Sequence, residues 1–347
     1  MRIEAMRRSV CRVATWLALL LTGSVAMGQK VSKVGTTAAP FLNIPVGARA
    51  LGMGGAFVSV ADDATALFWN PGGLARLRSS EAVFVHTNWI ADIGFDFAGA
   101  VLNLGAAGVI GLQGTYLNAG EMERTTEIYP EGTGEKFKAG SYALGITYAR
   151  GLTDRFSIGG TVKYVREYIL NSSAQGIAID LGTHFVTQFH NVTLGAVISN
   201  FGTKMRMTGR DLLVQYDIDP TRHGNNERIN ANLETDSYDM PLMLRVGVSV
   251  DLLQRLEGQN LVVAVDAAHP SDNVEHVNVG CEYRFHQFLA LRGGYRNLFS
   301  RDSEQGFTVG AGLRYGVAGD FAVKIDYAYE SFGRLNNVQK FSVGITF

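Results

Sequence analysis

The strongest constraint on the fold is a two-residue alternation of apolar and polar side chains that returns along most of the chain. In the segment from Asp320 to Glu330, every odd position is large and apolar, and every even position is small or charged. This period places the two kinds of side chain on opposite faces of a β-strand. The same alternation occurs in the segments 242–251 and 277–285. We therefore predict an all-β fold.

About 14 such segments can be counted, each close to the ten residues that a tilted strand needs to cross a bilayer. They begin near Glu81, Gly94, Ala107, Ala139, Arg155, Gly176, Asn191, Pro241, Gln259, Val274, Gln287, Gly306, Asp320 and Asn337. Closed bacterial barrels have an even number of strands. The count therefore favours a transmembrane antiparallel β-barrel.

The connections between these segments are expected to alternate between short turns and longer loops, as they do in outer-membrane barrels. The short ones lie near 105–106, 151–154, 189–190, 252–258, 286 and 316–319, and the long ones include 118–138, 201–240 and 297–305. We expect this alternation throughout, with the long loops outside the cell. The segment 341–347 also ends on an aromatic residue and resembles the final strand of bacterial outer-membrane barrels. A soluble β-sandwich or propeller is the alternative fold.

In a membrane barrel, the apolar face of each strand contacts lipid and the polar face lines the lumen. The charged residues expected to line the lumen are Arg245, Asp266, Glu282, Arg292, Arg314, Lys324 and Asp326. Some tyrosines are candidates for the aromatic girdles at the membrane surfaces. They are Tyr148, Tyr164, Tyr283 and Tyr315.

Composition and motifs exclude several classes of function. Lys and Arg total 31 against 32 Asp and Glu, which leaves no basic surface for nucleic acid. The motifs of serine hydrolases, zinc proteases and phosphate-binding loops are absent from the sequence. His276, Glu282 and His286 share one strand face but lie too far apart along it to converge on one metal. We expect no catalytic activity, no cofactor and no metal.

Residues 1–28 have the features of a cleaved secretory signal. Arginines at positions 2, 7, 8 and 12 precede an apolar stretch at 13–21, and small residues lead to Gly28. The apolar stretch is shorter than the roughly 20 residues of a membrane-spanning helix. The exported chain is expected to begin near Gln29. Cys281 would then be its one cysteine, so no internal disulfide can form.

Residues 29–80 are rich in Gly and Ala and are expected to form an N-terminal hatch, or plug, ahead of a barrel over 81–347. We expect a compact strand, a turn and a short helix that Asp62 or Asp63 caps. Asn70 and Pro71 should end that helix and wedge Phe68 and Trp69 into the barrel wall. The candidate hatch motif consists of Gly52, Gly54, Gly55, Asp62, Asp63, Trp69, Asn70, Pro71 and Gly72. A dinucleotide site at Gly52 is not supported, because the third glycine of that fingerprint is replaced by Phe57.

At these residues the chain resembles the PorV/PorQ-type outer-membrane proteins, whose barrels are related in architecture to FadL-type transporters. The resemblance rests on the runs 47–57, 62–64 and 69–74, in that order directly before the first strand. It covers the hatch strongly and the barrel in pattern and strand count. Where relatives usually have Asn-Pro-Ala, this chain has Asn70-Pro71-Gly72. The resemblance implies a hatch folded inside a barrel of about 14 strands in the cell outer membrane.

Two functions are consistent with this resemblance. One is a non-enzymatic role in protein export or surface display, with secreted cargo proteins and components of a type IX-like system as partners besides membrane lipid. The other is FadL-like, hatch-gated transport of hydrophobic solutes, which needs an apolar concave entry site. The longest loop, 201–240, is rich in charge, and its one apolar run is Leu212-Leu213-Val214. This polar loop favours recognition of a protein, although long surface loops are commonly polar.

Overall fold

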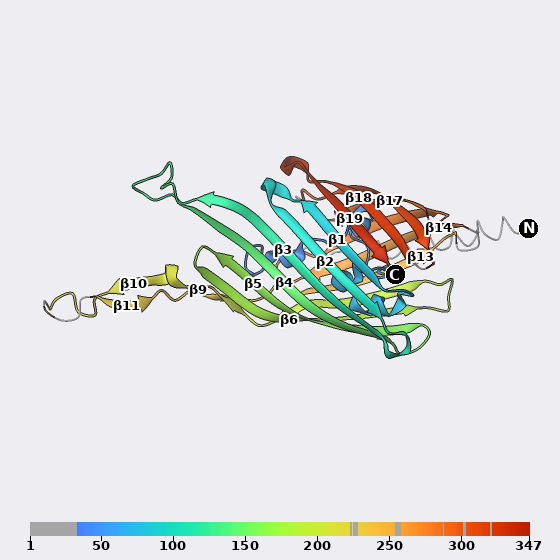
Figure 1. Cartoon of the computed structure of the whole chain (residues 1–347), viewed down its shortest axis with the longest axis horizontal. Coiled ribbons are helices and arrows are strands. Elements are labelled where there is room, and N and C mark those ends of the chain that lie inside the picture. The colour runs from blue at the N-terminus through green and yellow to red at the C-terminus, as the bar shows by residue number, and fades with distance from the viewer. Residues whose placement is uncertain are drawn as a thin grey trace, which may run out of the picture. The chain divides into compact units, whose positions relative to one another are not determined.

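The computed structural model describes residues 33–222, 224, 228–253, 258–286, 288–300, 303–319 and 321–347. Two runs of seven long strands dominate it (Figure 1). The first run is β1 Glu81–Asn88, β2 Gly94–Asn103, β3 Val109–Glu123, β4 Lys136–Gly151, β5 Phe156–Ile169, β6 Ser172–Val186 and β7 Thr193–Gly202. The second is β13 Met243–Asp251, β14 Gln259–Pro270, β15 His276–Phe285, β16 Leu289–Leu298, β17 Phe307–Ala318, β18 Phe321–Ser331 and β19 Asn337–Thr346.

These strands form a closed antiparallel barrel. Each strand pairs with its neighbours in sequence, β7 pairs with β13, and β1 pairs with β19 to close the cylinder. The prediction of a barrel of 14 strands is confirmed. The strand starts also agree closely with the expected ones. The largest difference is at β6, which begins at Ser172 rather than near Gly176.

The barrel carries its apolar side chains outside, which separates it from a soluble sandwich. Ile146 and Leu181 are 64% and 60% exposed, although both lie in the middle of long strands. Their neighbours Thr147 and Asp180 are buried inside. A soluble β-protein places its apolar face in the core. The alternation therefore matches a barrel surrounded by lipid.

The two ends of the barrel differ in their connections. The end at which β1 begins and β19 ends carries short turns, and the opposite end carries the two longest connections, 124–135 and 203–242. The expectation that every connection at the second end is long is wrong. Leu170 and Asn171 alone join β5 to β6 there. These two strands have 14 and 15 residues, so their extra length projects from the barrel in place of a loop.

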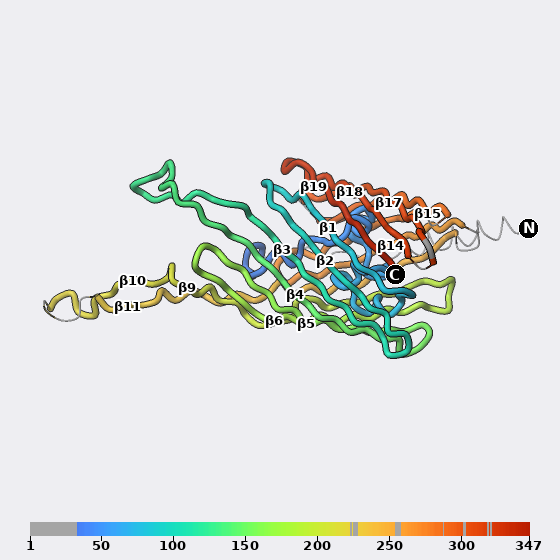
Figure 2. The backbone as a smooth tube through the Cα atoms, in the orientation of Figure 1, coloured from blue at the N-terminus to red at the C-terminus, as the bar shows by residue number. Residues whose placement is uncertain are grey.

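The longest connection is an arm with its own strands rather than a plain loop (Figures 1 and 2). Strand β10 (Leu213–Tyr216) pairs with β11 (Ile229–Asn232), and β8 (Met205–Arg206) pairs with β12 (Ser237–Tyr238). Strand β9 (Thr208–Gly209) adds to the projecting end of β6, and η5 (Arg210–Leu212) follows it. Other short turns of 3-10 helix lie between barrel strands. They are η3 Ile90–Asp92, η4 Gly105–Ala107 and η6 Gly333–Leu335.

The residues from Lys33 to Ser80 lie inside the barrel and contain only short helical elements. They are η1 Pro40–Asn43, α2 Ala48–Gly52, α3 Ala66–Trp69 and η2 Pro71–Arg76. The strand expected in this segment is not found among the described residues. Its backbone takes left-handed conformations at Gly47 and Gly54, with φ of 87° and 65°, which interrupt an extended chain.

The helix expected near residue 63 is present but short. The residue before it is Thr65, whose side chain makes no capping bond. Asp63 instead accepts a hydrogen bond from the amide of Thr65, two residues on, at 2.9 Å. The helix ends at Trp69, before Asn70 and Pro71, as expected. No helix among the described residues is long and apolar enough to cross a bilayer.

Candidate functional site

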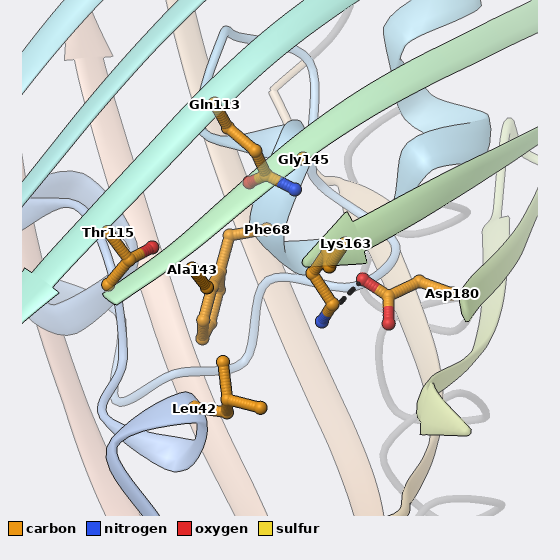
Figure 3. Close-up of a pocket in the computed structure, with 8 residues that line it drawn as sticks. All are labelled: Leu42, Phe68, Gln113, Thr115, Ala143, Gly145, Lys163 and Asp180. Carbon is orange, nitrogen blue, oxygen red and sulfur yellow. Dashed lines mark ion pairs between the residues drawn. The ribbon is translucent and has the colours of Figure 1, made fainter. Parts of the chain in front are cut away.

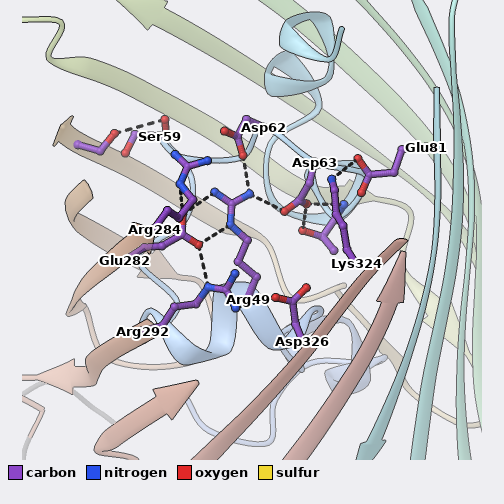
Figure 4. A network of polar contacts seen from close by, with 12 residues as sticks. Arg49, Ser59, Asp62, Asp63, Glu81, Glu282, Arg284, Arg292, Lys324 and Asp326 are labelled. Atoms are coloured by element: carbon purple, nitrogen blue, oxygen red, sulfur yellow. Dashed lines mark hydrogen bonds and ion pairs between the residues drawn. The ribbon is translucent and has the colours of Figure 1, made fainter. Parts of the chain in front are cut away.

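The contact between hatch and barrel wall is centred on Arg49, which extends from α2. Its Nε and Nη2 donate to the two carboxylate oxygens of Glu282 on β15, at 2.8 and 3.0 Å. Its Nη1 donates to Asp62 and Asp63 of the hatch, at 2.5 and 2.8 Å. Figure 4 shows Arg49 between these three acids. One guanidinium thus joins two turns of the hatch to the wall.

Further ion pairs extend this cluster around the wall (Figure 4). Arg292 on β16 donates from Nε to Glu282 and from Nη1 to Asp326 on β18, both at 2.7 Å. Lys324 on β18 donates to Glu81 at 2.8 Å. We refer to these residues, with Arg284, Arg49, Asp62 and Asp63, as the hatch network. Buried charges of both signs are neutralised within it, so the loss of one leaves others unpaired.

The network also sets the ionisation of the two hatch residues at its centre. Burial opposes the charged form of Asp63, but the Arg49 and Lys324 cations hold its pKa below the usual value. Burial likewise opposes the charge of Arg49, but Asp62, Glu282 and Asp63 raise the pKa of its guanidinium well above the usual value. Both residues are therefore charged at neutral pH.

Glycines in the wall let the hatch backbone approach closely. A Cβ atom at Gly280 of β15 would lie 2.0 Å from the carbonyl oxygen of Met53. A Cβ at Gly294 of β16 would lie 2.3 Å from the amide nitrogen of Gly54. Such separations are far shorter than any van der Waals contact. The hatch and these two strands therefore fit only without side chains on the wall.

The expected hatch motif is in contact with the wall at its first glycines. Gly52 accepts a hydrogen bond from Thr308 of β17 at 3.2 Å. Gly54 has a φ of 65° and packs against the backbone of Tyr295, which leaves no room for a side chain. Gly55 has a φ of 73° beside Trp69. The close approach and the positive φ explain why glycine occupies these positions.

Asn70 joins two parts of the hatch to the wall. Its Nδ2 donates to the carbonyl of Val58 at 2.8 Å and to that of Thr183 on β6 at 2.9 Å. Its Oδ1 accepts from the amide of Gly72 at 3.1 Å. The side chain is fully buried, and a Cβ on Gly72 would approach the carbonyl of Gly182 at 2.8 Å. The Asn-Pro-Gly turn is thus an anchor point.

The expectation that Trp69 wedges into the wall is wrong. Its ring packs edge-to-face against Phe57, with 68° between the ring planes, and its Nε1 donates to the carbonyl of Val46 at 2.7 Å, so it belongs to the core of the hatch. The wall contacts it through the guanidinium of Arg245, 5.3 Å above the ring. Phe68, by contrast, faces the wall and lines a cavity there.

That cavity holds only about 10 Å³, room for about one water molecule. Figure 3 shows Phe68 in it opposite the ion pair of Lys163 and Asp180, which is 2.8 Å long. The residues that line it are Leu42, Phe68, Gln113, Thr115, Ala143, Gly145, Lys163 and Asp180. An apolar molecule would find neither the volume nor the surface that it needs.

All seven charged residues expected to line the lumen lie on the inward faces of their strands, and six of them are buried or half-buried there. Four of them, Glu282, Arg292, Lys324 and Asp326, belong to the hatch network, and Arg245 packs on Trp69. Asp266 accepts from the amides of Phe57 and Val58 at 2.7 and 2.8 Å. Arg314 differs, because it is exposed near the short-turn end of β17, outside the buried charges.

Arg49 and Lys340 are among the buried cations that were not singled out in the sequence. Arg49 is the one charged residue in the small-residue run 47–57. Its isolation there could have indicated a buried ion pair. Lys340 of β19 is fully buried, donates to the carbonyl of Pro45 and lies 5.8 Å from the ring of Phe95. Nothing local distinguishes Lys340 from other polar residues of its strand. Among the described residues, no cluster of His, Cys, Asp and Glu could hold a metal.

The hatch begins at the long-loop end of the barrel and runs to the short-turn end. Three hydrogen bonds place its start: Thr37 to Asp272 at 2.9 Å, Ala38 to the carbonyl of Asp239 at 2.9 Å and Ala39 to Glu167 at 3.1 Å. Its end lies where β1 starts, and Asn103 there donates to the carbonyl of Leu77 at 2.7 Å. The segment thus passes along the whole lumen.

The arm has a different character. Leu213, Tyr216 and Ile218 are 50%, 59% and 67% exposed, and an open groove of about 500 Å³ lies between its two small sheets. Its base is tied to the β5–β6 turn by Asp211, which accepts from the amide and the side chain of Asn171 at 2.8 and 3.0 Å. The hydrogen bonds from Asn171 hold the pKa of Asp211 below its usual value.

A closed barrel with apolar side chains outside and a hatch filling its lumen defines an outer-membrane β-barrel protein. The family model of the type IX secretion system protein PorV matches residues 27–208, slightly more than half of the chain. The chain therefore belongs to the PorV family, as its hatch motif indicated. No curated protein shows significant similarity to it.

Solved structures agree on the fold. The monoaromatic hydrocarbon channel CymD is similar with a TM-score of 0.55 and 13% identity, covering 87% of this chain and 97% of that one. A FadL homologue of Pseudomonas aeruginosa gives 0.53 and 13%, covering 87% and 98%. The toluene transporter TodX of Pseudomonas putida gives 0.53 and 13%, covering 87% and 97%. At this identity the likeness shows a FadL-type architecture.

Proposed function

We propose that this protein is a non-enzymatic partner in protein export, which receives secreted proteins or secretion-system components at the long-loop end of the barrel. Long loops of outer-membrane barrels face outside the cell, so this end is the external one and the short-turn end is periplasmic. The family match to PorV supports the proposal. This protein would itself be exported with residues 1–28 as a cleaved signal. These residues lie outside the part of the chain that the structure describes.

The observation that carries the proposal is the contrast between a filled lumen and an exposed arm. The lumen contains the hatch, and the cavity beside Phe68 has room for about one water. The arm presents half-exposed Leu213 and Tyr216 on a two-stranded sheet whose edges lack partner strands among the described residues. Unpaired strand edges can bind an extended segment of another protein. Recognition outside the barrel is thus better supported than passage through it.

The alternative is hatch-gated transport of hydrophobic solutes. It is favoured by the similarity of the barrel to monoaromatic hydrocarbon channels. The cavity beside Phe68 weighs against it, because its lining includes the Lys163–Asp180 ion pair. Solute sites are mostly apolar and several hundred Å³ in volume.

A shortened arm tests the proposal. The amide of Leu233 donates to the carbonyl of Leu212 at 2.8 Å, so a two-residue turn can join these residues in place of 213–232. We expect the variant to form a heat-modifiable barrel but to lose surface display of secreted proteins in whole cells. Toluene uptake, measured in the same cells, should not change. Normal display with impaired uptake would instead support the alternative.

A further inference from the structure

The outer wall carries a row of polar side chains across four strands. The row lies where the apolar surface of the barrel ends on the side of the long loops. Tyr116 on β3 pairs with Tyr142 on β4, which pairs with Arg166 on β5, which pairs with Gln175 on β6. All four alternate with buried residues and therefore face outward. Tyr164 and Tyr168 flank Arg166 on the same face of β5. We refer to these six residues as the outer polar row.

The row marks one edge of the membrane-facing belt. Below it the outward residues of β4 are Leu144, Ile146 and Tyr148, which are 56%, 64% and 49% exposed. Arg150 follows them at the periplasmic end. Tyr142 and Arg150 are separated by eight residues, or roughly 26 Å along the tilted strand. The nine residues from Tyr142 to Arg150 are about what a tilted strand needs to cross the apolar band, so the outer polar row lies at the long-loop, external border of that band.

Arg166 has no carboxylate partner among the described residues. Its Nη2 donates to the hydroxyl of Ser173 at a long 3.4 Å, and its side chain also interacts with that of Tyr142. Its Nε is shielded from solvent and has no acceptor. Lys138, a cation near this end of β4, pairs with Glu121 at 3.3 Å. A guanidinium at the edge of an apolar surface needs a counter-ion to offset its lost hydration.

The surrounding side chains can accommodate an anionic oxygen group. The hydroxyl groups of Tyr116 and Tyr168 share a hydrogen bond of 3.3 Å, which leaves one hydroxyl hydrogen of the pair free to donate outward. Tyr164 donates to Gln175 at 2.7 Å, which leaves the amide nitrogen of Gln175 as a free donor in that pair. The planar fork of arginine binds phosphate through two parallel hydrogen bonds. The donors in the row thus match a phosphate rather than an uncharged headgroup.

We propose that Arg166 and the tyrosines beside it form a binding site for the phosphorylated headgroup of an outer-leaflet membrane lipid. The lipid chains would lie along the apolar belt below, over Leu144 and Ile146. This site is separate from the arm and does not depend on the export function. The competing interpretation is that Arg166 only extends to the membrane surface, as arginines near membrane borders commonly do.

The experiment compares two arginines on the same wall at opposite membrane surfaces. The full-length protein in detergent is titrated with lipid A that carries its phosphates, and the Tm is followed by the loss of heat-modifiable migration. We expect a rise in Tm for the wild type and for Arg150→Gln, and at most half of that rise for Arg166→Gln. Phosphate-free lipid A and inorganic phosphate at equal concentration should give less than half of the wild-type rise.

Several results would overturn the proposal. If the Tm of Arg166→Gln rises as much as that of the wild type, Arg166 is not the site. If Arg166→Gln and Arg150→Gln lose the same part of the Tm rise, the effect is not specific to Arg166. An equal rise with phosphate-free lipid A shows that the chains alone are bound. If Arg166→Gln does not fold, Arg166→Lys keeps the charge without the fork, and we expect at most half of the wild-type rise. A full rise with that variant also contradicts the proposed phosphate site.

Discussion

The hatch network and the arm both contain many charged residues, but they differ in how those charges are neutralised. In the hatch network, Glu282 is fully buried and forms ion pairs with Arg49 and Arg292. In the arm, Arg206 and Glu234 form an ion pair at 2.9 Å whose side chains are 47% and 78% exposed. Removing one partner of a buried ion pair strongly destabilises a protein, because the other charge is left buried and unpaired. Exposed ion pairs contribute little to stability. Loss of one charge should therefore cost more stability in the hatch network than in the arm.

The largest effect is expected from Arg49→Met. The change leaves Glu282, Asp62 and Asp63 without their shared cation, so the barrel should lose about 3 to 5 kcal/mol of stability. The measurement is urea unfolding of the full-length protein in detergent. Arg206→Met in the arm is the matched control and should cost less than about 1 kcal/mol. Equal losses at the two positions would remove the distinction between the two regions.

The next effect concerns the turn that anchors the hatch. Asn70→Ala combined with Gly72→Val removes three hydrogen bonds and adds bulk against the carbonyl of Gly182. Loss of the Asn70 side chain alone should cost about 1 to 3 kcal/mol, because buried acceptors remain unpaired. We expect intact heat-modifiable migration with raised conductance of small solutes in planar bilayers. A variant that assembles normally, conducts nothing new and still supports display would show that this turn is an ordinary loop.

A smaller effect is expected at the wall glycines. Gly280→Ala places a methyl group against the backbone of Met53 and should cost about 1 to 3 kcal/mol. Gly293→Ala is the control, since no atom within 4 Å would meet its Cβ. Thermal unfolding of the two variants compares them directly. If both lose the same stability, close backbone contact does not position the hatch.

The smallest effect is expected at the base of the arm. The pKa of Asp211 is lowered by hydrogen bonds from Asn171, so its contribution is present above the usual carboxyl pKa and is lost as the pH falls below it. Hydrogen exchange at the Asn171 amide should therefore accelerate relative to its intrinsic rate as the pH falls below about 4. The Asp211→Asn variant should not show this step. A step that persists in the variant must come from another group.

The barrel could be predicted because its signals are local. Each strand start lies within four residues of the expected position, as β6 shows at Ser172. The two-residue period depends only on neighbours along the chain. The hatch was recognised through the runs around Gly52 and Asn70, whose conformations and close contacts restrict the residues that fit there.

The errors fall where neighbours in space decide the conformation. The expected hatch strand is absent among the described residues, because the hatch backbone bonds to wall side chains such as Asp266 instead of a partner strand. Trp69 looked like a wall contact but packs with Phe57 inside the hatch. The β5–β6 connection was expected to be long, yet strand length replaced it at Leu170 and Asn171. None of these outcomes is encoded in a short window of sequence.

The sequence by itself determined the strand period, the strand count and the family, since alternation and turn residues act over a few positions. The tertiary structure decided which charges meet. Arg49 and Glu282 are separated by 233 positions in sequence, and only the closed barrel with its hatch inside brings them within 2.8 Å. It also decided that Arg314, on the same kind of strand face as Arg292, stays exposed. Ion pairing depends on strand register and on the depth of the hatch in the lumen, and both are set by contacts across the whole barrel.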